Sequence, residues 1–306
     1  MPVNHYRRAK PLESGARVVL VAPAGPLQKP EELPRAQENA RAFGWEPIVA
    51  QHATERIGYL AGHDRNRLND INGALRDPSV DAIWCLRGGY GMIRILPGID
   101  YDALSRSPKA IIGYSDITAL HAAVQRKCRL ITYHGPTARE PLGDFSRDSF
   151  ERAVVRQTDP CGAAPNARAI NAGTADGRLV GGNLAVLASL CGTPFMPDLT
   201  DGILILEDIN EPVYRIDRML QQLKLSGVLN ACKAIAFGEC VKCPDDTGGG
   251  GRGFDEVLGE IAHALAVPCL AGIPVGHIDA QWTLPLGAMA TIDTRTRTLT
   301  VTSYSS

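Results

Sequence analysis

Residues 110–118, Ala-Ile-Ile-Gly-Tyr-Ser-Asp-Ile-Thr, are expected to join a buried strand to a helix. The apolar start of this stretch is typical of a strand end, Gly113 allows a sharp turn, and a helical pattern begins at Ile117. Such a turn would present Ser115 at the carboxyl end of the strand, beside the first amides of the helix. This is the arrangement of a nucleophile elbow, although Ile117 replaces the second glycine of G-x-S-x-G. A Ser-Asp pair is also a common helix N-cap, so a purely structural role stays open.

The sequence before this stretch alternates between strand and helix patterns. Apolar runs predict strands at 17–24, 45–50, 81–86 and 109–112, and helical patterns occupy 30–43 and 64–75. This alternation predicts a parallel, doubly wound sheet, in which ligands bind beyond the carboxyl ends of the strands. Ser115 and the glycine-rich loop Arg87-Gly88-Gly89-Tyr90-Gly91 would both lie at that edge.

The C-terminal half has a different pattern. Residues 158–177 are rich in Ala, Gly, Pro and Asn without hydrophobic periodicity, which predicts a linker between domains at 1–157 and 178–306. Beyond it, Leu179–Leu184 is expected to open an apolar helix. Strands are expected at 202–206 and 234–238, and a hairpin at 290–302, without regular alternation with helices. This half is therefore predicted to be α+β, with a small sheet or barrel.

Composition narrows the function classes. The chain has 306 residues, 44% of them hydrophobic and 21% charged, and a net charge of -1, so no overall field favours nucleic acid or an anionic membrane. The N-terminal apolar runs are too short for a signal peptide or a membrane span, so a cytoplasmic location is expected. Cys240 and Cys243 form a C-x-x-C without a second pair at zinc spacing; we interpret it as chance and assign no metal.

A nucleophilic serine needs a base, and the base needs an orienting acceptor. Of seven histidines, His277 follows a strand end bounded by glycines, and His134, at another strand end, is its main rival. Glu207 directly follows a buried strand and could accept the proton on Nδ1 of His277. It could equally cap the next element or pair with Arg215 or Arg218.

Six motifs occur in the order Leu86–Gly91 (LRGGYG), Ile112–Asp116 (IGYSD), His134–Pro136 (HGP), Leu179–Leu184 (LVGGNL), Leu206–Arg218 (LEDINEPVYRIDR) and Gly276-His277 with Thr283–Gly287 (TLPLG). Together they resemble the LD-carboxypeptidase family of serine peptidases, the muramoyltetrapeptide carboxypeptidases, which includes the microcin-immunity peptidases. The resemblance extends from about Arg17 to the C-terminus. It implies a flavodoxin-like or Rossmann-like N-terminal domain and a smaller C-terminal domain, with the active site in the cleft between them.

The resemblance also implies roles for single residues. Ser115 would be the nucleophile, His277 the base and Glu207 its orienting acid in a Ser-Glu-His triad. Glu211, four residues on, is the competing acid, and Glu207 is preferred because the buried strand would hold it more rigidly.

In the same way, the amides of Gly89 and Asp116 would form the oxyanion hole. Arg87, Tyr114 and Trp282 are candidates for contact with the substrate. A guanidinium such as that of Arg87 can bind a carboxylate through two hydrogen bonds, and a structural ion pair is the alternative for this residue.

The implied function is removal of the terminal D-alanine from murein tetrapeptides during cytoplasmic cell-wall recycling. Family members need no cofactor or metal and are commonly homodimers, so a homodimer acting on a small peptide is expected. One alternative is a microcin-immunity type peptidase that cleaves an acyl-sulfamoyl or peptidyl nucleotide. Another is a two-domain small-molecule binding protein without catalysis, which would give no reason for the three candidate residues to stand at strand ends.

Overall fold

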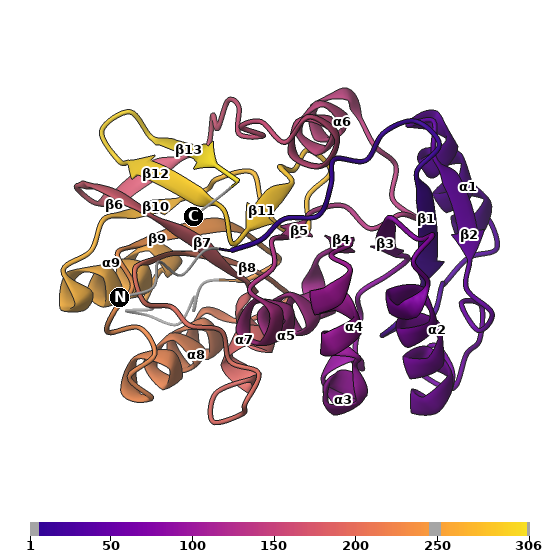
Figure 1. Cartoon of the computed structure of the whole chain (residues 1–306). Coiled ribbons are helices and arrows are strands. Elements are labelled where there is room, and N and C mark those ends of the chain that lie inside the picture. The colour runs from indigo at the N-terminus through magenta and orange to yellow at the C-terminus, as the bar shows by residue number, and fades with distance from the viewer. Residues whose placement is uncertain (1–5, 245–251, 305–306) are drawn as a thin grey trace.

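The computed structural model describes residues 6–244 and 252–304, which form two sheets flanked by helices (Figure 1). The first sheet has the order β11-β5-β4-β3-β1-β2. Its strands are β1 (Arg17–Val21), β2 (Glu46–Val49), β3 (Ala82–Cys85), β4 (Ala110–Gly113), β5 (Thr132–His134) and β11 (Leu284–Leu286). The first five are parallel, as the alternating pattern predicts, and β11 is antiparallel to β5.

Helical segments connect these parallel strands, and two more follow the last of them, β5. They are α1 (Glu32–Ala42), α2 (Asp64–Arg76), α3 (Met92–Ile95), η1 (Leu96–Gly98), α4 (Tyr101–Arg106), η2 (Ser115–Ile117), α5 (Thr118–Cys128), α6 (Asp144–Phe150) and a π-helical turn η3 (Glu151–Arg156). The strand β4 runs directly into η2 and α5, so the connection predicted around Ser115 is present.

The second sheet is curled and has the order β13-β12-β7-β8-β9-β10-β6. Its elements are β6 (Arg168–Asn171), β7 (Thr174–Asn183), α7 (Leu184–Ser189), β8 (Gly202–Ile209), α8 (Val213–Leu225), β9 (Ala234–Val241), α9 (Phe254–Leu265), β10 (Cys269–Ala271), β12 (Met289–Asp293) and β13 (Thr298–Ser303). Figure 1 shows α7, α8 and α9 on one face of this sheet. The fold class expected from the sequence, a parallel α/β half and a smaller mixed half, is confirmed.

Two expectations for the C-terminal half are wrong. Strands β7 to β10 are parallel and alternate regularly with α7, α8 and α9. The motif Leu179–Leu184 is the end of β7 and not the start of a helix. Its glycines, Gly181 and Gly182, have φ of +125° and +133° and pair with β8 in parallel register. The helix begins only at Leu184, where the Asn183 side chain accepts a hydrogen bond from the amide of Val186.

The predicted linker is too long. Residues 158–167 contain no helix or strand, but β6 and the first part of β7 occupy most of residues 168–177. The sequence gives no sign of these strands because their small and polar residues lack hydrophobic alternation. Backbone pairing with β10 and β12 specifies them instead.

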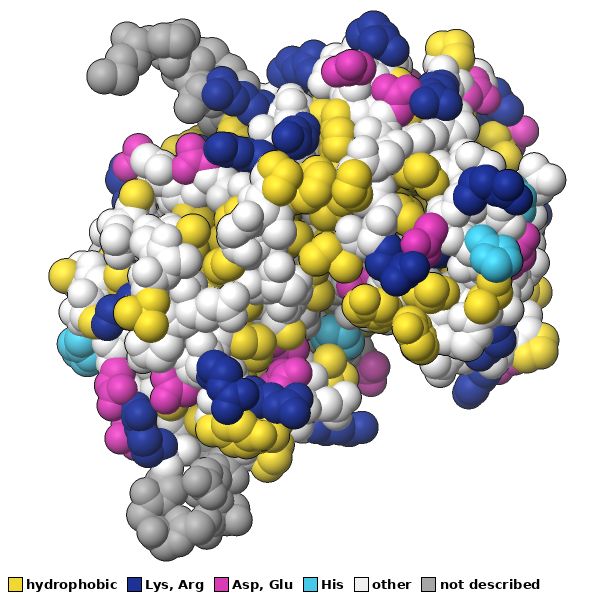
Figure 2. Space-filling view, turned by 90° about the horizontal axis from the view of Figure 1, so that it is seen from below, with side chains coloured by type: hydrophobic (Ala, Val, Ile, Leu, Met, Phe, Trp, Pro, Cys, Tyr) yellow, Lys and Arg dark blue, Asp and Glu magenta, His cyan; other side chains and the backbone are white. Residues whose placement is uncertain are grey.

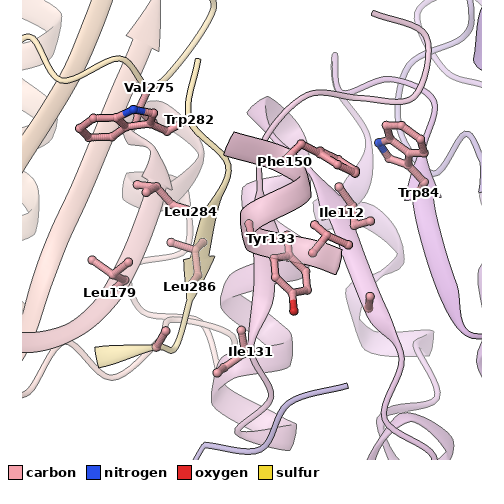
Figure 3. Close-up of a cluster of buried hydrophobic side chains, with 14 of the residues drawn as sticks. Trp84, Ile112, Ile131, Tyr133, Phe150, Leu179, Val275, Trp282, Leu284 and Leu286 are labelled. Atoms are coloured by element: carbon pink, nitrogen blue, oxygen red, sulfur yellow. The ribbon is translucent and has the colours of Figure 1, made fainter. Parts of the chain in front are cut away.

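The two halves are joined by a shared core. The strand β11, more than 100 residues after the first sheet's other strands, adds to that sheet's edge beside β5 (Figure 1). Figure 3 shows side chains that fill this junction, which come from β11 and the segment just before it, from β5 and the residue before it, and from the end of α6: Trp282, Leu284, Leu286, Ile131, Tyr133 and Phe150. The halves therefore pack as one body around a continuous hydrophobic cluster.

Acidic and basic side chains are interspersed on the face seen in Figure 2, in agreement with the near-zero net charge. Within residues 6–244 and 252–304, no helix has the length and apolar character needed to cross a membrane. Cys240 and Cys243 are joined by a disulfide, which corrects the interpretation of this pair as a chance spacing. The turn after β9 brings their Cα atoms to 5.6 Å, a separation that a disulfide can span.

Candidate active site

Ser115 sits on a strained turn at the carboxyl end of β4. Its φ is +63°, a left-handed conformation that a residue with a side chain adopts only when its surroundings enforce it. Gly113 precedes it with φ of +156°, and a Cβ there would come within 3.1 Å of Cys85 Cβ and of Ile117. Tight packing on both sides of the turn thus fixes the serine, as the nucleophile-elbow interpretation requires.

The glycine-rich loop lies directly against this turn. A Cβ on Gly88 would be 2.8 Å from Ser115 Cβ and 3.1 Å from the Asp116 nitrogen, so only glycine fits there. The Asp116 carboxylate is buried and accepts a hydrogen bond from the amide of Met92, at 2.8 Å. Burial raises the pKa of Asp116 to about 6, although hydrogen bonds from the loop oppose this shift. The Asp116 side chain therefore fastens the end of the loop to the serine turn.

His277 brings the two halves of the molecule together at the site. Its Nδ1 lies 2.8 Å from Oε2 of Glu207, and its Nε2 lies 3.2 Å from Oγ of Ser115. Because a carboxylate can only accept, Nδ1 carries the proton and Nε2 is free to accept from the serine hydroxyl. Burial lowers the pKa of His277, but the hydrogen bond and charge of Glu207, with the charges of Glu140 and Asp208, outweigh it and raise the pKa.

Glu207 is held near the carboxyl end of β8 and is fully buried. The pairing of β8 with β9 shifts register between Leu206 and Asp208, and such an irregularity turns a side chain out of the regular pleat. The rival acid Glu211 forms an ion pair with Arg215 instead. Of the two candidate acids, only Glu207 is hydrogen-bonded to His277 in the described part of the chain.

The rival base His134 is completely buried at the end of β5. Burial lowers its pKa to about 3, and neither ring nitrogen has a hydrogen-bond partner among the described residues. Its ring packs edge-on against Tyr114, 6.0 Å between centroids, rather than against the serine. The geometry therefore favours His277 as the partner of Ser115.

A cavity of about 580 Å³ opens beside His277. The Tyr114 ring forms one wall, with its centroid 4.9 Å from that of His277, and its hydroxyl donates to Glu140 at 3.0 Å. Burial raises the pKa of Glu140. The remaining lining comes from residues near α6 and from the segment after His277: Pro136, Pro141, Gly143, Asp144, Phe145, Ser146, Ile278, Asp279, Ala280 and Gln281. Tyr114, predicted to contact the substrate, thus lies where a ligand could reach it.

The other two substrate-binding candidates lie elsewhere. Trp282 is only 1% exposed and packs in the shared core (Figure 3), so it does not line this cavity. Its neighbour Gln281 lines the cavity instead, because successive residues of an extended segment point to opposite sides. Arg87 is half-buried beside Gly25 and Gly89, and its guanidinium donates to the carbonyl of Pro26.

Sequence reasoning missed Glu140, Gly88 and Gln281. Glu140 follows the His-Gly-Pro motif by only four residues, so the motif could have drawn attention to it. Gln281 carried no comparable signal, since its neighbour Trp282 is the more conspicuous residue. Glycine content alone could not single out Gly88 from Gly89, because only the approach of Ser115 distinguishes them.

Comparison with known proteins identifies the family. The model of the LD-carboxypeptidase N-terminal domain matches residues 18–135, and that of the LD-carboxypeptidase C-terminal domain matches residues 176–292. The chain belongs to the LD-carboxypeptidase family. It is accordingly a serine carboxypeptidase by family, which confirms the resemblance based on the six motifs.

Relatives and a solved structure agree with this membership. The chain is 34% identical to the probable murein peptide carboxypeptidase of Bacillus subtilis, over 96% of this chain and 94% of that protein. It is 32% identical to the murein tetrapeptide carboxypeptidase of Pseudomonas aeruginosa, over 90% and 93% of the respective chains. Among solved structures, MccF in complex with glutamyl sulfamoyl guanosine matches with a TM-score of 0.88 and 27% identity, over 96% of this chain and 98% of that chain.

Proposed function

We propose that this protein is a serine LD-carboxypeptidase that removes the terminal D-alanine from murein tetrapeptides. The hydrogen-bonded series Ser115, His277 and Glu207 is the observation that carries the proposal. In it, a hydroxyl is aligned with an imidazole whose other nitrogen is held by a buried carboxylate, which is the arrangement that activates a serine. The names of the related murein peptide carboxypeptidases support the choice of substrate.

In the proposed mechanism, the hydroxyl of Ser115 attacks the carbonyl carbon of the bond before D-alanine, and Nε2 of His277 takes its proton. Glu207 stabilises the resulting imidazolium through Nδ1. The amides of Asp116 and Gly89 are proposed to hold the oxyanion, which the packing of Gly88 against Ser115 and Asp116 supports. His277 then gives its proton to the amine of D-alanine, which leaves.

The acyl-enzyme on Ser115 is hydrolysed in the second half of the reaction. A water molecule takes the place of the departed D-alanine and His277 removes its proton. The carboxylate of the tripeptide is released and the serine hydroxyl is restored by the same proton. No step in this scheme requires a cofactor.

The test is release of free D-alanine from L-Ala-γ-D-Glu-meso-diaminopimelate-D-Ala, measured with EDTA present. Wild type is expected to release it, whereas Ser115→Ala and His277→Ala should each lower kcat by about 10⁴- to 10⁶-fold, because triad residues act as a unit. His263→Ala, which changes an exposed histidine on α9, is the matched control and should retain activity. Near-normal turnover by Ser115→Ala would overturn the proposal.

A second candidate is hydrolysis of an aminoacyl-sulfamoyl nucleoside. The likeness to MccF with glutamyl sulfamoyl guanosine, at a TM-score of 0.88, supports it. The carboxylates of Glu140, Asp144 and Asp279 around the cavity argue against an acidic aminoacyl group there. Measuring both substrates with the same enzyme preparation separates the two activities.

The family resemblance is also the basis for proposing a homodimer that works in the cytoplasm. Light scattering of the purified protein measures its molar mass and so tests whether it is a homodimer. Cell fractionation, with the protein detected by an antibody, tests whether it is located in the cytoplasm.

A further inference from the structure

Besides the contact between Ser115 and His277, a second hydrogen bond joins the serine turn to the C-terminal half. The amide of Asn183, at the end of β7, donates to Oγ1 of Thr118 at 2.9 Å. Thr118 is fully buried and is the first residue of α5, three residues after Ser115. Figure 1 shows α5 beside α7, the helix that follows β7. The contact thus lies about one helical turn from the proposed nucleophile.

The approach of β7 to Thr118 depends on Gly182. A Cβ on Gly182 would come within 2.5 Å of Oγ1 of Thr118 and within 3.2 Å of Nδ1 of His134. A side chain at this position would therefore hold the strand away from both α5 and β5. The glycine has a packing reason as well as a conformational one, because it brings the amide of Asn183 within reach of the threonine hydroxyl.

Asn183 is held firmly within the second half. Its Oδ1 accepts a hydrogen bond from the amide of Val186 at 3.1 Å, and its Nδ2 donates to Oδ1 of the buried Asp208 at 3.2 Å. In the sheet, Asn183 pairs directly with Glu207 of β8. Neighbouring strands lie only about 4.8 Å apart. The amide that bonds Thr118 therefore belongs to the same rigid unit as the proposed acid.

These contacts and those of the triad form a closed ring. The chain leads from Ser115 to Thr118, and Thr118 is hydrogen-bonded to Asn183. Asn183 pairs with Glu207, and Glu207 is hydrogen-bonded to His277. His277 completes the ring through its contact with Ser115. The separation of the proposed nucleophile and base thus depends on how the Thr118 contact holds the two halves.

A hydrogen bond defines this separation more narrowly than the shared hydrophobic core can. Apolar burial has no preferred direction, whereas an N–H···O bond is restricted to about 2.7–3.2 Å. The distance of 3.2 Å between Ser115 Oγ and His277 Nε2 is at the long end of hydrogen-bond distances. A small outward movement of β7 and β8 relative to the serine turn would therefore break the contact on which activation of the serine depends.

We propose that Thr118 is a positioning residue of the active site. By accepting the hydrogen bond from Asn183, its hydroxyl holds the serine turn of the first sheet at the distance from the Glu207 strand that His277 spans. This inference rests on the proposed function and adds a residue that acts through the placement of Ser115 rather than on the substrate.

The experiment measures D-alanine release by wild type, Thr118→Val and Thr118→Ser. Thr118→Val replaces the acceptor with a methyl group. It should lower kcat by about 10- to 100-fold and change KM by less than about twofold, because a displacement of about 1 Å can lower the rate 10²-fold without removing a contact with the substrate. Thr118→Ser keeps the hydroxyl and should restore kcat to within about threefold of wild type.

Gln125→Leu is the matched control. Gln125 is also buried on α5, and its Nε2 donates to the carbonyl of Leu179 on β7 at 3.3 Å. The control therefore removes a hydrogen bond between the same two elements, about two helical turns further from Ser115. It should lower the urea midpoint of unfolding, as Thr118→Val does, but leave kcat close to that of wild type. This comparison separates lost stability from lost positioning.

A kcat for Thr118→Val equal to that of wild type, or to that of Gln125→Leu, would overturn the inference while leaving the carboxypeptidase proposal intact. A loss in Thr118→Ser as large as in Thr118→Val would also overturn it. If Thr118→Val fails to fold, Thr118→Ala provides the same test, because it removes the hydroxyl without placing a methyl group against Gly182.

If wild type releases no D-alanine, the rate at which a fluorophosphonate labels Ser115 takes the place of kcat, with Ser115→Ala as the blank. In this reaction Oγ displaces fluoride from phosphorus and His277 takes the proton, so only an activated serine is needed. Slower labelling of Thr118→Val than of Gln125→Leu supports the inference even though the proposed substrate is then wrong. Equal labelling of the two variants, or no labelling of wild type, refutes it.

Discussion

Gly276 lies so close to Glu207 that a Cβ added to Gly276 would come within 3.0 Å of both Cβ and Oε2 of that glutamate. Gly276, the residue before the proposed base His277, thus packs against the proposed acid Glu207. Gly276 also has a φ of +121°, which side chains disfavour. The approach is possible only with glycine, and it allows the backbone before His277 to pass beside the end of β8.

Gly276→Ala is predicted to impair catalysis by displacing the Glu207 carboxylate from His277. We expect kcat/KM to fall by about 10²-fold, since a misplacement of about 1 Å can have that effect. The measurement is D-alanine release at a fixed pH. Gly192→Ala is the matched control, because Gly192 also has a positive φ, +79°, but open space around its Cβ position. Equal activity losses in the two variants would assign the effect to backbone strain rather than to Glu207.

The pH dependence of catalysis should report the raised pKa of His277. The base must be neutral, so kcat/KM rises with pH as His277 loses its proton, and a raised pKa moves this acidic limb above the ordinary value of 6.5. Glu207→Gln removes the carboxylate that contributes most to raising the pKa, so the limb should move to lower pH. The maximal rate should also fall, by about 10⁴-fold by analogy with other triads. If the acidic limb of kcat/KM lay at the same pH in wild type and in Glu207→Gln, this role for Glu207 would be contradicted.

Asp116 is predicted to act as a positioning residue for the glycine-rich loop. Asp116→Ala removes the acceptor for the amide of Met92 and should lower kcat more than it raises KM, because the loop carries a proposed oxyanion donor. Asp116→Asn keeps an acceptor oxygen and should restore a large part of kcat. Equal losses in the two variants would show that this hydrogen bond does not support catalysis.

The shared core predicts that the two halves unfold together. Leu284→Ala, in β11, deletes a fully buried side chain and is expected to lower the free energy of unfolding by about 2–5 kcal/mol. Leu225→Ala is the matched control, because that leucine is 83% exposed, and it should change stability little. Urea titrations followed by tryptophan fluorescence and by residual activity should give one coincident transition. Two separate transitions would contradict a common core.

Local pattern was sufficient for much of the fold. The apolar runs in the N-terminal half correspond to strands β1 to β4, and the predicted C-terminal hairpin corresponds to β12 and β13. Prediction failed where side chains do not specify the structure. The small and polar residues of β6 and of the first part of β7 form strands because they pair with β10 and β12. The end of β7 was mistaken for a helix start because it contains the glycine pair Gly181-Gly182.

The sequence by itself determined the alternation of the first half and the membership of Ser115, Glu207 and His277 in recognisable motifs. These features depend on residues close together in the chain. Only the tertiary structure decided which acid contacts His277, since Glu207 and Glu211 are four residues apart in the sequence but have different partners. It also decided that Trp282 packs in the core while Gln281 lines a cavity. Such outcomes depend on contacts between distant segments, for example those of His277 with Glu207 and with Ser115, which are 70 and 162 residues away in the sequence, and no local pattern encodes them.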